Sequence, residues 1–268
     1  MTRRRKILIR CAAVLAGLIV IATVAFFIYF PGRQSTLALM LATGIGINNV
    51  QAEIDVLEAK AITGETFTSE DKAFLKDLYT CFAKGARLTI VLRQSAQLMD
   101  HYLSNSGEDL RIAPRIFLGS RPVREQMADI RERIASDVHL RGAPDGKYST
   151  PVFYMGDPAF FESYVGLYYG TLTAAPALQK DGTVLVQWRA DMPWQWPSYE
   201  SLLKKHGNYH AQCFSLPNVR GILQGPEYCL RMDDGLGEYL AQLGLAKPFL
   251  VYSQWREQMP AGESSMPN

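Results

Sequence analysis

The fold of this chain is decided by residues 181–190, which read DGTVLVQWRA. Asp181 and Gly182 are typical of a two-residue hairpin turn. In residues 183–190, every second side chain is apolar, as in a strand with one buried face. Residues 165–173, before the turn, are rich in residues that favour strands. We therefore expect antiparallel β structure around this turn.

The chain before this hairpin has helical periodicity. Apolar side chains recur every three or four residues over about 35–62, 74–82, 88–103 and 123–138. Thr68 and Asp71 have the spacing of a capping box, and Ser120 can cap the last of these helices. Later, residues 235–243 resemble a short helix and residues 248–255 a final strand. These patterns predict an α+β fold in which a helical half packs on a small, mainly antiparallel sheet.

The N-terminal region carries the signal of a membrane anchor. Residues 11–30 read CAAVLAGLIVIATVAFFIYF and contain no charged side chain. A helix of about 20 residues spans roughly 30 Å, the thickness of the hydrocarbon core of a bilayer. The basic residues from Arg3 to Lys6 precede it, so the N-terminus should stay cytoplasmic and the chain after Pro31 should be exported. A cleaved signal peptide is the alternative, but its apolar core would be shorter and would end in small residues.

Charge is distributed unevenly along the chain. Five of the 28 basic residues lie within residues 1–30, which contain no acidic residue. Residues 31–268 contain the remaining 23 basic residues and all 26 acidic residues, so they carry a formal net charge of −3. A nucleic-acid-binding protein needs a basic face, and no basic run follows Arg10. We therefore expect no nucleic-acid partner.

These signals divide the chain into five parts. Composition changes after the loop-like residues 141–151, because residues 148–199 hold 12 of the aromatic residues, which number 13 Tyr, 12 Phe and 4 Trp. We expect a single-pass bacterial inner-membrane protein rather than a Golgi enzyme, since the exported part has no Asn-x-Ser/Thr site and no Asp-x-Asp metal motif. The predicted parts are a cytoplasmic tail (1–6), a transmembrane signal anchor (7–30), a periplasmic helical subdomain (31–140), an aromatic-rich α+β subdomain (141–258) and a flexible tail (259–268).

The most unusual stretch is an aromatic segment bracketed by prolines. Three tryptophans, at positions 188, 194 and 196, lie close together, and the prolines at 193 and 197 stiffen the backbone. Tryptophan and tyrosine dominate binding hot spots, so Trp194, Trp196 and Tyr199 are our candidates for contact with a protein partner. The alternative is a core role, because the aromatic residues of a small α+β domain are usually buried.

The exported cysteines and histidines offer a disulfide and a weak metal site. A disulfide between Cys213 and Cys229 would suit the oxidising periplasm and close a short loop. Cys81 lies in a helical stripe and is expected to be a buried free thiol. His206 and His210 have ligand-like spacing, but the glycine after His206 is expected to end a helix, so the two rings need not share a face. We therefore predict no metal site and no cofactor.

Two classes of function are compatible with these features. The first is a membrane-tethered periplasmic binding protein without catalysis, such as an envelope-complex subunit or an immunity-like inhibitor of a toxin. It depends on the anchor and on the absence of catalytic motifs such as Gly-x-Ser-x-Gly or a P-loop. The alternative is a periplasmic hydrolase of cell-wall glycan or lipid, with acids drawn from Asp157, Glu162, Asp191 and Glu200. We prefer the binding protein, because no motif ties one of these acids to a second.

Overall fold

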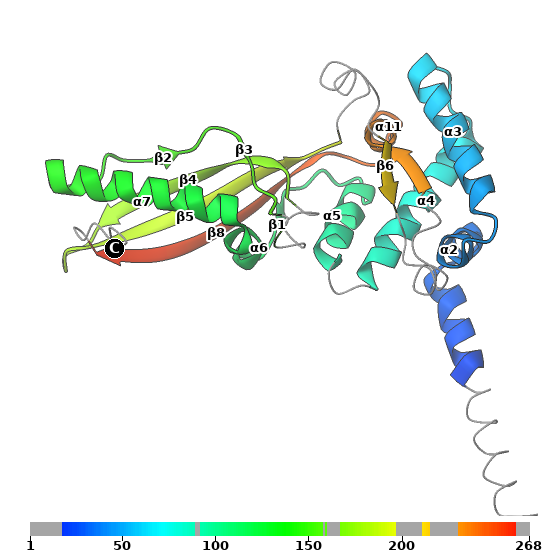
Figure 1. The fold of residues 1–268 in the computed structure, drawn as a ribbon, viewed down its shortest axis with the longest axis horizontal. Helices are drawn as coiled ribbons and strands as arrows, with labels where there is room; N and C mark the ends of the chain where they lie inside the picture. The colour runs from blue at the N-terminus through cyan, green and yellow to red at the C-terminus, as the bar shows by residue number, and fades with distance from the viewer. Residues whose placement is uncertain are drawn as a thin grey trace, which may run out of the picture. The chain divides into compact units, whose positions relative to one another are not determined.

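The computed structural model describes residues 18–88, 92–157, 159, 167–196, 211–214 and 230–260. These residues form a mixed α+β fold, as the sequence predicted. The chain forms two compact units (Figure 1). Unit 1 comprises Met1–Gly85 and Pro197–Tyr239, and unit 2 comprises Ala86–Trp196 and Leu240–Asn268. Each unit therefore combines two separate stretches of chain. The composition of the sequence instead predicted two consecutive subdomains that meet near residue 141.

Unit 1 is built mainly from helices. The sequence pattern predicted one helix over about 35–62, and this was wrong, because the chain breaks between α2 and α3. Gly44 and Gly46 stand at the break with φ angles of 71° and 76°, a left-handed conformation that ends helices and is readily adopted by glycine. The elements are a helix over Leu18–Tyr29, α2 (Arg33–Thr43), α3 (Ile47–Thr63), most of α4 (Ser69–Arg87), the paired strands β6 (Ala211–Phe214) and β7 (Leu230–Asp233), and the beginning of α11 (Asp234–Gln242).

The start of α4 is a capping box, as the spacing of Thr68 and Asp71 predicted. The main-chain N–H of Asp71 donates to Thr68 Oγ1 over 3.1 Å, and the main-chain N–H of Thr68 donates to Asp71 Oδ2 over 2.8 Å. Lys60, near the end of α3, also donates to Asp71 Oδ2 over 2.7 Å. Burial raises the pKa of Asp71, but the hydrogen bonds from Lys60 and Thr68 outweigh it and hold the pKa below its usual value. This carboxylate therefore joins α3 to α4.

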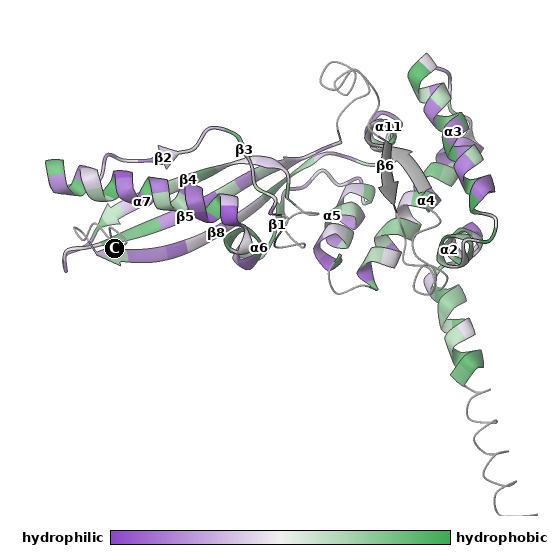
Figure 2. Cartoon of the chain, viewed as in Figure 1, coloured by the Kyte–Doolittle hydropathy of each residue, from purple (hydrophilic) through white to green (hydrophobic). Residues whose placement is uncertain are grey.

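The helix over Leu18–Tyr29 is strongly apolar (Figure 2). Among the described residues, no single helix is both long and apolar enough to cross a membrane. Leu18–Tyr29 and α2 meet that requirement only as a pair, and the pair is bent by 117°. Residues 7–17, which the predicted transmembrane helix also includes, lie outside the described residues.

Unit 2 contains a six-stranded sheet with strand order β1-β8-β5-β4-β2, and β3 also pairs with β4. β1 is parallel to β8 and the other pairs of this sheet are antiparallel, which confirms the predicted mainly antiparallel sheet. Asp181 and Gly182 lie in the turn between β4 and β5, as predicted, but the connection comprises residues 179–182 rather than two residues, and Gly182 has a φ of 82°. The strands are β1 (Leu110–Arg111), β2 (Tyr148–Ser149), β3 (Phe153–Tyr154), β4 (Tyr169–Leu178), β5 (Thr183–Trp194) and β8 (Phe249–Pro260), and the helices are α5 (Arg93–Leu103), α6 (Pro114–Gly119) and α7 (Arg121–Arg141).

α7 lies along one face of this sheet (Figure 1). Ser120 caps the helix as predicted, because its Oγ accepts the N–H of Val123 over 3.4 Å and donates to the carbonyl of Met155 over 2.5 Å. The predicted apolar stripe of α7 is buried from Val123 to Ile134, whereas Val138 at its end is half-buried, and alternate residues of the two strands beneath it are buried too. The core of unit 2 therefore includes Val123, Met127, Ile130 and Ile134 on the helix and Leu172, Ala174, Val184, Val186, Trp188 and Ala190 on the sheet.

One carboxylate joins α7 to the sheet. Glu257 on β8 accepts the Nε1–H of Trp188 over 2.9 Å, and it accepts from Arg131 of α7 over 3.0 Å at Nε and 3.1 Å at Nη2. Trp188 is only 1% exposed, so its N–H needs an acceptor within the protein. The guanidinium of Arg131 also lies 5.8 Å from the centre of the Trp188 ring.

Replacing Glu257 should therefore lower stability more than replacing its partner. Glu257→Ala leaves the buried N–H of Trp188 without its acceptor, a loss of about 1–3 kcal/mol in the free energy of unfolding. Arg131→Ala removes a partly exposed ion pair, worth about 0–1 kcal/mol. Urea denaturation of the full chain in detergent micelles, followed by tryptophan fluorescence, measures both changes. Equal losses would contradict this role for Glu257.

Candidate functional site

The sheet face opposite α7 is polar. Successive side chains of a strand point to opposite faces, so the residues between the buried ones project away from the helix. Strand pairing brings Thr173, Arg189 and Gln254 side by side across three strands, and it places Arg111 beside Tyr252. Figure 2 shows a hydrophilic stretch along β8. We define the open face as Arg111, Lys147, Thr171, Thr173, Gln187, Arg189, Asp191, Tyr252, Gln254 and Arg256.

A hollow of about 460 Å³ lies on the open face. It extends across the middle strands of the sheet, β4, β5 and β8, and reaches β1 at one side. Lys147, the residue before β2, also lines it. Its polar lining consists of Arg111, Lys147, Thr173, Gln187, Arg189, Gln254 and Arg256.

The open face is positively charged. Arg189 donates from Nε to both carboxylate oxygens of Asp191 over 2.8 Å. This hydrogen-bonded pairing raises the pKa of Arg189. Within the described part of the chain, no carboxylate lies within ion-pair distance of Arg111, Lys147 or Arg256. Three cations therefore face solvent here without an ion-pair partner among those residues, although Asp109 is close enough to act electrostatically on Arg189.

These groups are suited to binding anions rather than to proton transfer. A guanidinium group binds a carboxylate or phosphate through paired, charge-assisted hydrogen bonds. The side-chain amides of Gln187 and Gln254 can donate and accept alongside it. The open face contains no histidine or cysteine that would titrate near neutral pH. A ligand with several anionic groups spaced along the sheet matches this arrangement.

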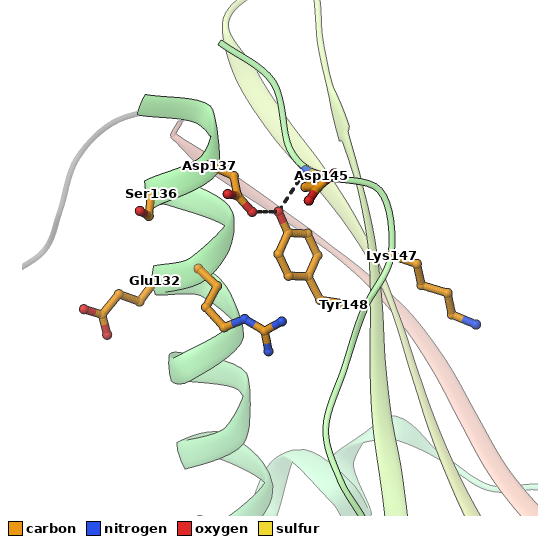
Figure 3. A pocket seen from close by; sticks show the side chains of 7 residues that line it. Glu132, Ser136, Asp137, Asp145, Lys147 and Tyr148 are labelled. Carbon is orange, nitrogen blue, oxygen red and sulfur yellow. Dashed lines mark hydrogen bonds between the residues drawn. The ribbon is translucent and has the colours of Figure 1, made fainter. Parts of the chain in front are cut away.

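A second hollow, of about 450 Å³, lies between the end of α7 and the segment before β2 (Figure 3). Here the hydroxyl of Tyr148 donates to Asp137 over 2.5 Å and accepts the main-chain N–H of Asp145 over 2.9 Å. Burial and the bond to Asp137 raise the pKa of Tyr148, so the phenol stays protonated. Arg141 lies 3.8 Å from Asp137 and 2.8 Å from Asp145. These hydrogen bonds and ion pairs satisfy the polar groups that line the hollow, and they connect the segment before β2 to α7.

The two hydrolase candidates that the structure describes, Asp157 and Asp191, are each bound by other groups of the protein. Asp157 is 3% exposed and accepts two main-chain N–H groups over 2.8 and 2.9 Å, which lower its pKa. Asp191 is paired with Arg189. Glu162 and Glu200 lie outside the described residues. Within the part that is described, no group of three or more His, Cys, Asp or Glu residues could hold a metal ion.

The predicted partner-binding aromatic residues lie in different environments. Trp194 ends β5 and is 7% exposed, with its ring 5.1 Å from that of Tyr102 and 5.4 Å from that of Phe249. This packing favours the core interpretation of Trp194. Trp196 is half-buried, and its ring lies 5.9 Å from that of Trp194. Tyr199 lies outside the described residues, so partner contact through Trp196 and Tyr199 stays a prediction.

Most of the cysteine and histidine predictions fall on undescribed positions. Cys213 lies in β6, opposite Arg231. Cys229, His206 and His210 lie outside the described residues. The disulfide and the weak metal candidates therefore stay predictions.

The cations of the open face are the residues that sequence reasoning missed. Arg111 and Arg256 are far apart in the chain, and no motif connects them. A partial signal was present, because the alternation in residues 183–190 puts Gln187 and Arg189 on the face opposite Trp188. No known protein family, curated protein or solved structure matches this chain.

Cys81 is the described thiol that could have served as a nucleophile. It is 3% exposed, and its Sγ donates to the carbonyl of Gln34 over 3.4 Å. The prediction of a buried free thiol is confirmed. Burial raises the pKa of Cys81 to about 12. The side chain therefore stays in the thiol form, which is unreactive because the thiolate is the nucleophile.

Cys81 should therefore resist alkylation in the folded protein. At pH 8 the thiolate fraction is very small because the pKa lies far above this pH, and the side chain is also inaccessible. Iodoacetamide treatment of the full chain in detergent micelles, followed by peptide mass mapping, should find Cys81 unmodified until the protein is unfolded. Lys76→Cys places a thiol at an exposed position of the same helix as a control. Equal alkylation rates at the two positions in folded protein would contradict the assignment.

Proposed function

We propose that this chain is a membrane-tethered periplasmic binding protein without catalysis, and that the open face binds its partner. One observation carries this proposal. Residues 31–268 have a net charge of −3, yet Arg111, Lys147 and Arg256 are gathered on one exposed sheet face. Charges concentrated in this way favour encounter with an oppositely charged surface. An envelope-complex subunit and an immunity-like inhibitor both fit this role.

The N-terminal helix supports the proposed inner-membrane anchor over residues 7–30. The side chain of Lys84 donates to the carbonyl of Tyr29 over 2.6 Å, a favourable position for a cation at the end of a helix. Apolar side chains on this helix are exposed, a surface that water disfavours and a bilayer would cover. Those more than half exposed are Leu18, Ile19, Val20, Ile21, Val24, Phe27 and Ile28.

The hydrogen bonds and ion pairs that the described carboxylates form favour a binding function over hydrolysis. A glycosidase needs two carboxyl groups that flank the scissile bond, one of them available to donate a proton. Asp157 instead accepts main-chain hydrogen bonds, and Asp191 is paired with Arg189. Asp137 accepts from Tyr148. These described carboxylates have structural roles.

Export of the chain can be tested with paired reporters. Alkaline phosphatase fused after Asn268 should be active, because this enzyme matures only outside the cytoplasm. A fluorescent protein that matures only in the cytoplasm, fused at the same position, should stay dark. Both fusions should sediment with membranes. Cytoplasmic fluorescence, or a soluble form cleaved near residue 30, would overturn the anchor.

Partner binding can be tested by charge reversal. The full chain, extracted from its own cell envelope in detergent, should retain a partner at constant stoichiometry. The double variant Arg111→Glu, Arg256→Glu should retain at least roughly tenfold less partner than the unmodified chain, because each charge-assisted hydrogen bond contributes about 1.5–3 kcal/mol. Lys180→Glu, an exposed change beside the β4–β5 turn, is the matched control. If the double variant melts normally and keeps its partner, the open face is not the binding surface.

A further inference from the structure

In the part of the chain that the structure describes, the outer edge of β8 pairs with another strand only near its beginning. β1 pairs with β8 only at Leu110 with Val251 and at Arg111 with Tyr252. The pairing ends with the N–H of Ile112, which donates to the carbonyl of Tyr252 over 3.0 Å. Among the described residues, no strand pairs with this side of β8 after Tyr252. Within the described part of the chain, residues 253–260 therefore have no paired strand on this side, although the hydroxyl of Ser253 still donates to the carbonyl of Ile112 over 2.9 Å and α6 also contacts β8.

Strand alternation identifies the main-chain groups that this edge presents. The bond from Ile112 shows that the main chain of Tyr252 is directed toward β1 and away from β5. Alternate residues of a strand share this direction. Gln254, Arg256 and Gln258 therefore direct their N–H and C=O groups outward. Their side chains lie on the same face as Tyr252, which is the open face.

The charges beside this edge select the sequence that could pair with it. A strand added to β8 would place alternate side chains on the open face, next to Arg256. On the other face, Glu257 is already bound by Arg131 and by the indole N–H of Trp188. The uncompensated charge at the edge is therefore positive. An acidic side chain opposite Arg256 would form a favourable cross-strand pair.

We propose that an extended, acidic segment of a partner protein adds to the sheet along residues 254–258 of β8. Main-chain hydrogen bonds to Gln254, Arg256 and Gln258 would provide affinity, as in other cases of strand addition. Acidic side chains at alternate positions of the segment would face Arg256 and the other cations of the open face. This inference depends on the proposed binding function and names the chemistry of the partner.

A second copy of this chain is a poorer occupant of the same edge. Arg256 lies at the centre of the outward-facing residues 254–258. Two antiparallel copies paired about that centre would place Arg256 opposite Arg256. Like charges directly opposite one another destabilise a strand pair. The charge pattern therefore disfavours self-pairing and favours an acidic partner.

Two peptides and three variants test this proposal on the full chain in detergent micelles. The probe is a nine-residue peptide that alternates glutamate and valine, and its counterpart carries lysine in place of glutamate. Gln258→Pro deletes one outward N–H and is compatible with an edge strand, since proline is tolerated where the N–H faces solvent. Gln258→Ala is the matched control, because it removes the same side chain and keeps the N–H. Arg256→Glu reverses the charge at the centre of the edge.

The glutamate peptide should bind at least tenfold more tightly than the lysine peptide, and it should slow amide hydrogen exchange at least fivefold within residues 253–260. Gln258→Pro should weaken this binding at least tenfold, whereas Gln258→Ala should change it less than twofold. Arg256→Glu should reverse the preference between the peptides. The proposal is overturned if the glutamate peptide does not bind at 1 mM, if Gln258→Pro binds like Gln258→Ala, or if the chain dimerises through this edge.

These outcomes are separable from those for the proposed function. A chain that is exported and retains its natural partner, but keeps that partner equally well with Gln258→Pro, would refute the edge and leave the binding function standing. A chain that is not exported, or that retains no partner, would refute the binding function whatever the peptides do.

Discussion

The alternation of side chains along β5 is the constraint on which the rest of unit 2 depends. β5 is paired on both sides, with β4 and with β8, so its side chains can point only to one face or to the other. Burying Val184, Val186 and Trp188 beneath α7 forces Gln187 and Arg189 onto the opposite face. A shift of register by one residue would exchange the two sets and bury a guanidinium group, so the pairing is strongly specified.

Among the described residues, one helical layer covers this sheet and leaves the opposite face open. The covered face is closed by Glu257, which joins α7 to the sheet through Arg131 and satisfies the buried indole of Trp188. On the other face, the polar side chains need no protein partner because water solvates them. The open face can therefore bind a partner without rearrangement of the residues buried beneath α7. The positive charge of Arg256 also limits pairing between identical edges, a common hazard of exposed strands.

Unit 1 has a different organising feature, the junction between the N-terminal helix and α4. Lys84 donates to the carbonyl of Tyr29 over 2.6 Å and to the side chain of Gln34 over 2.8 Å. Phe30, which follows the helix, is 5% exposed. The end of the apolar helix is thus held by a cation and by packing, so its direction is defined relative to α4. For a membrane-tethered protein, such a junction would orient unit 1 with respect to the bilayer.

Features that depend on interactions between neighbouring residues can be predicted from the sequence alone. The capping box of Thr68 and Asp71, the turn at Gly182 and the buried stripe of α7 all arise from interactions within a few positions, so their patterns can be read locally. The open face could not be read in this way. Arg111 joins it only because β1 pairs with β8, and Arg256 only because β8 pairs with β5. Hydrogen-bonded register between distant strands decides which side chains become neighbours, and no local pattern encodes that register.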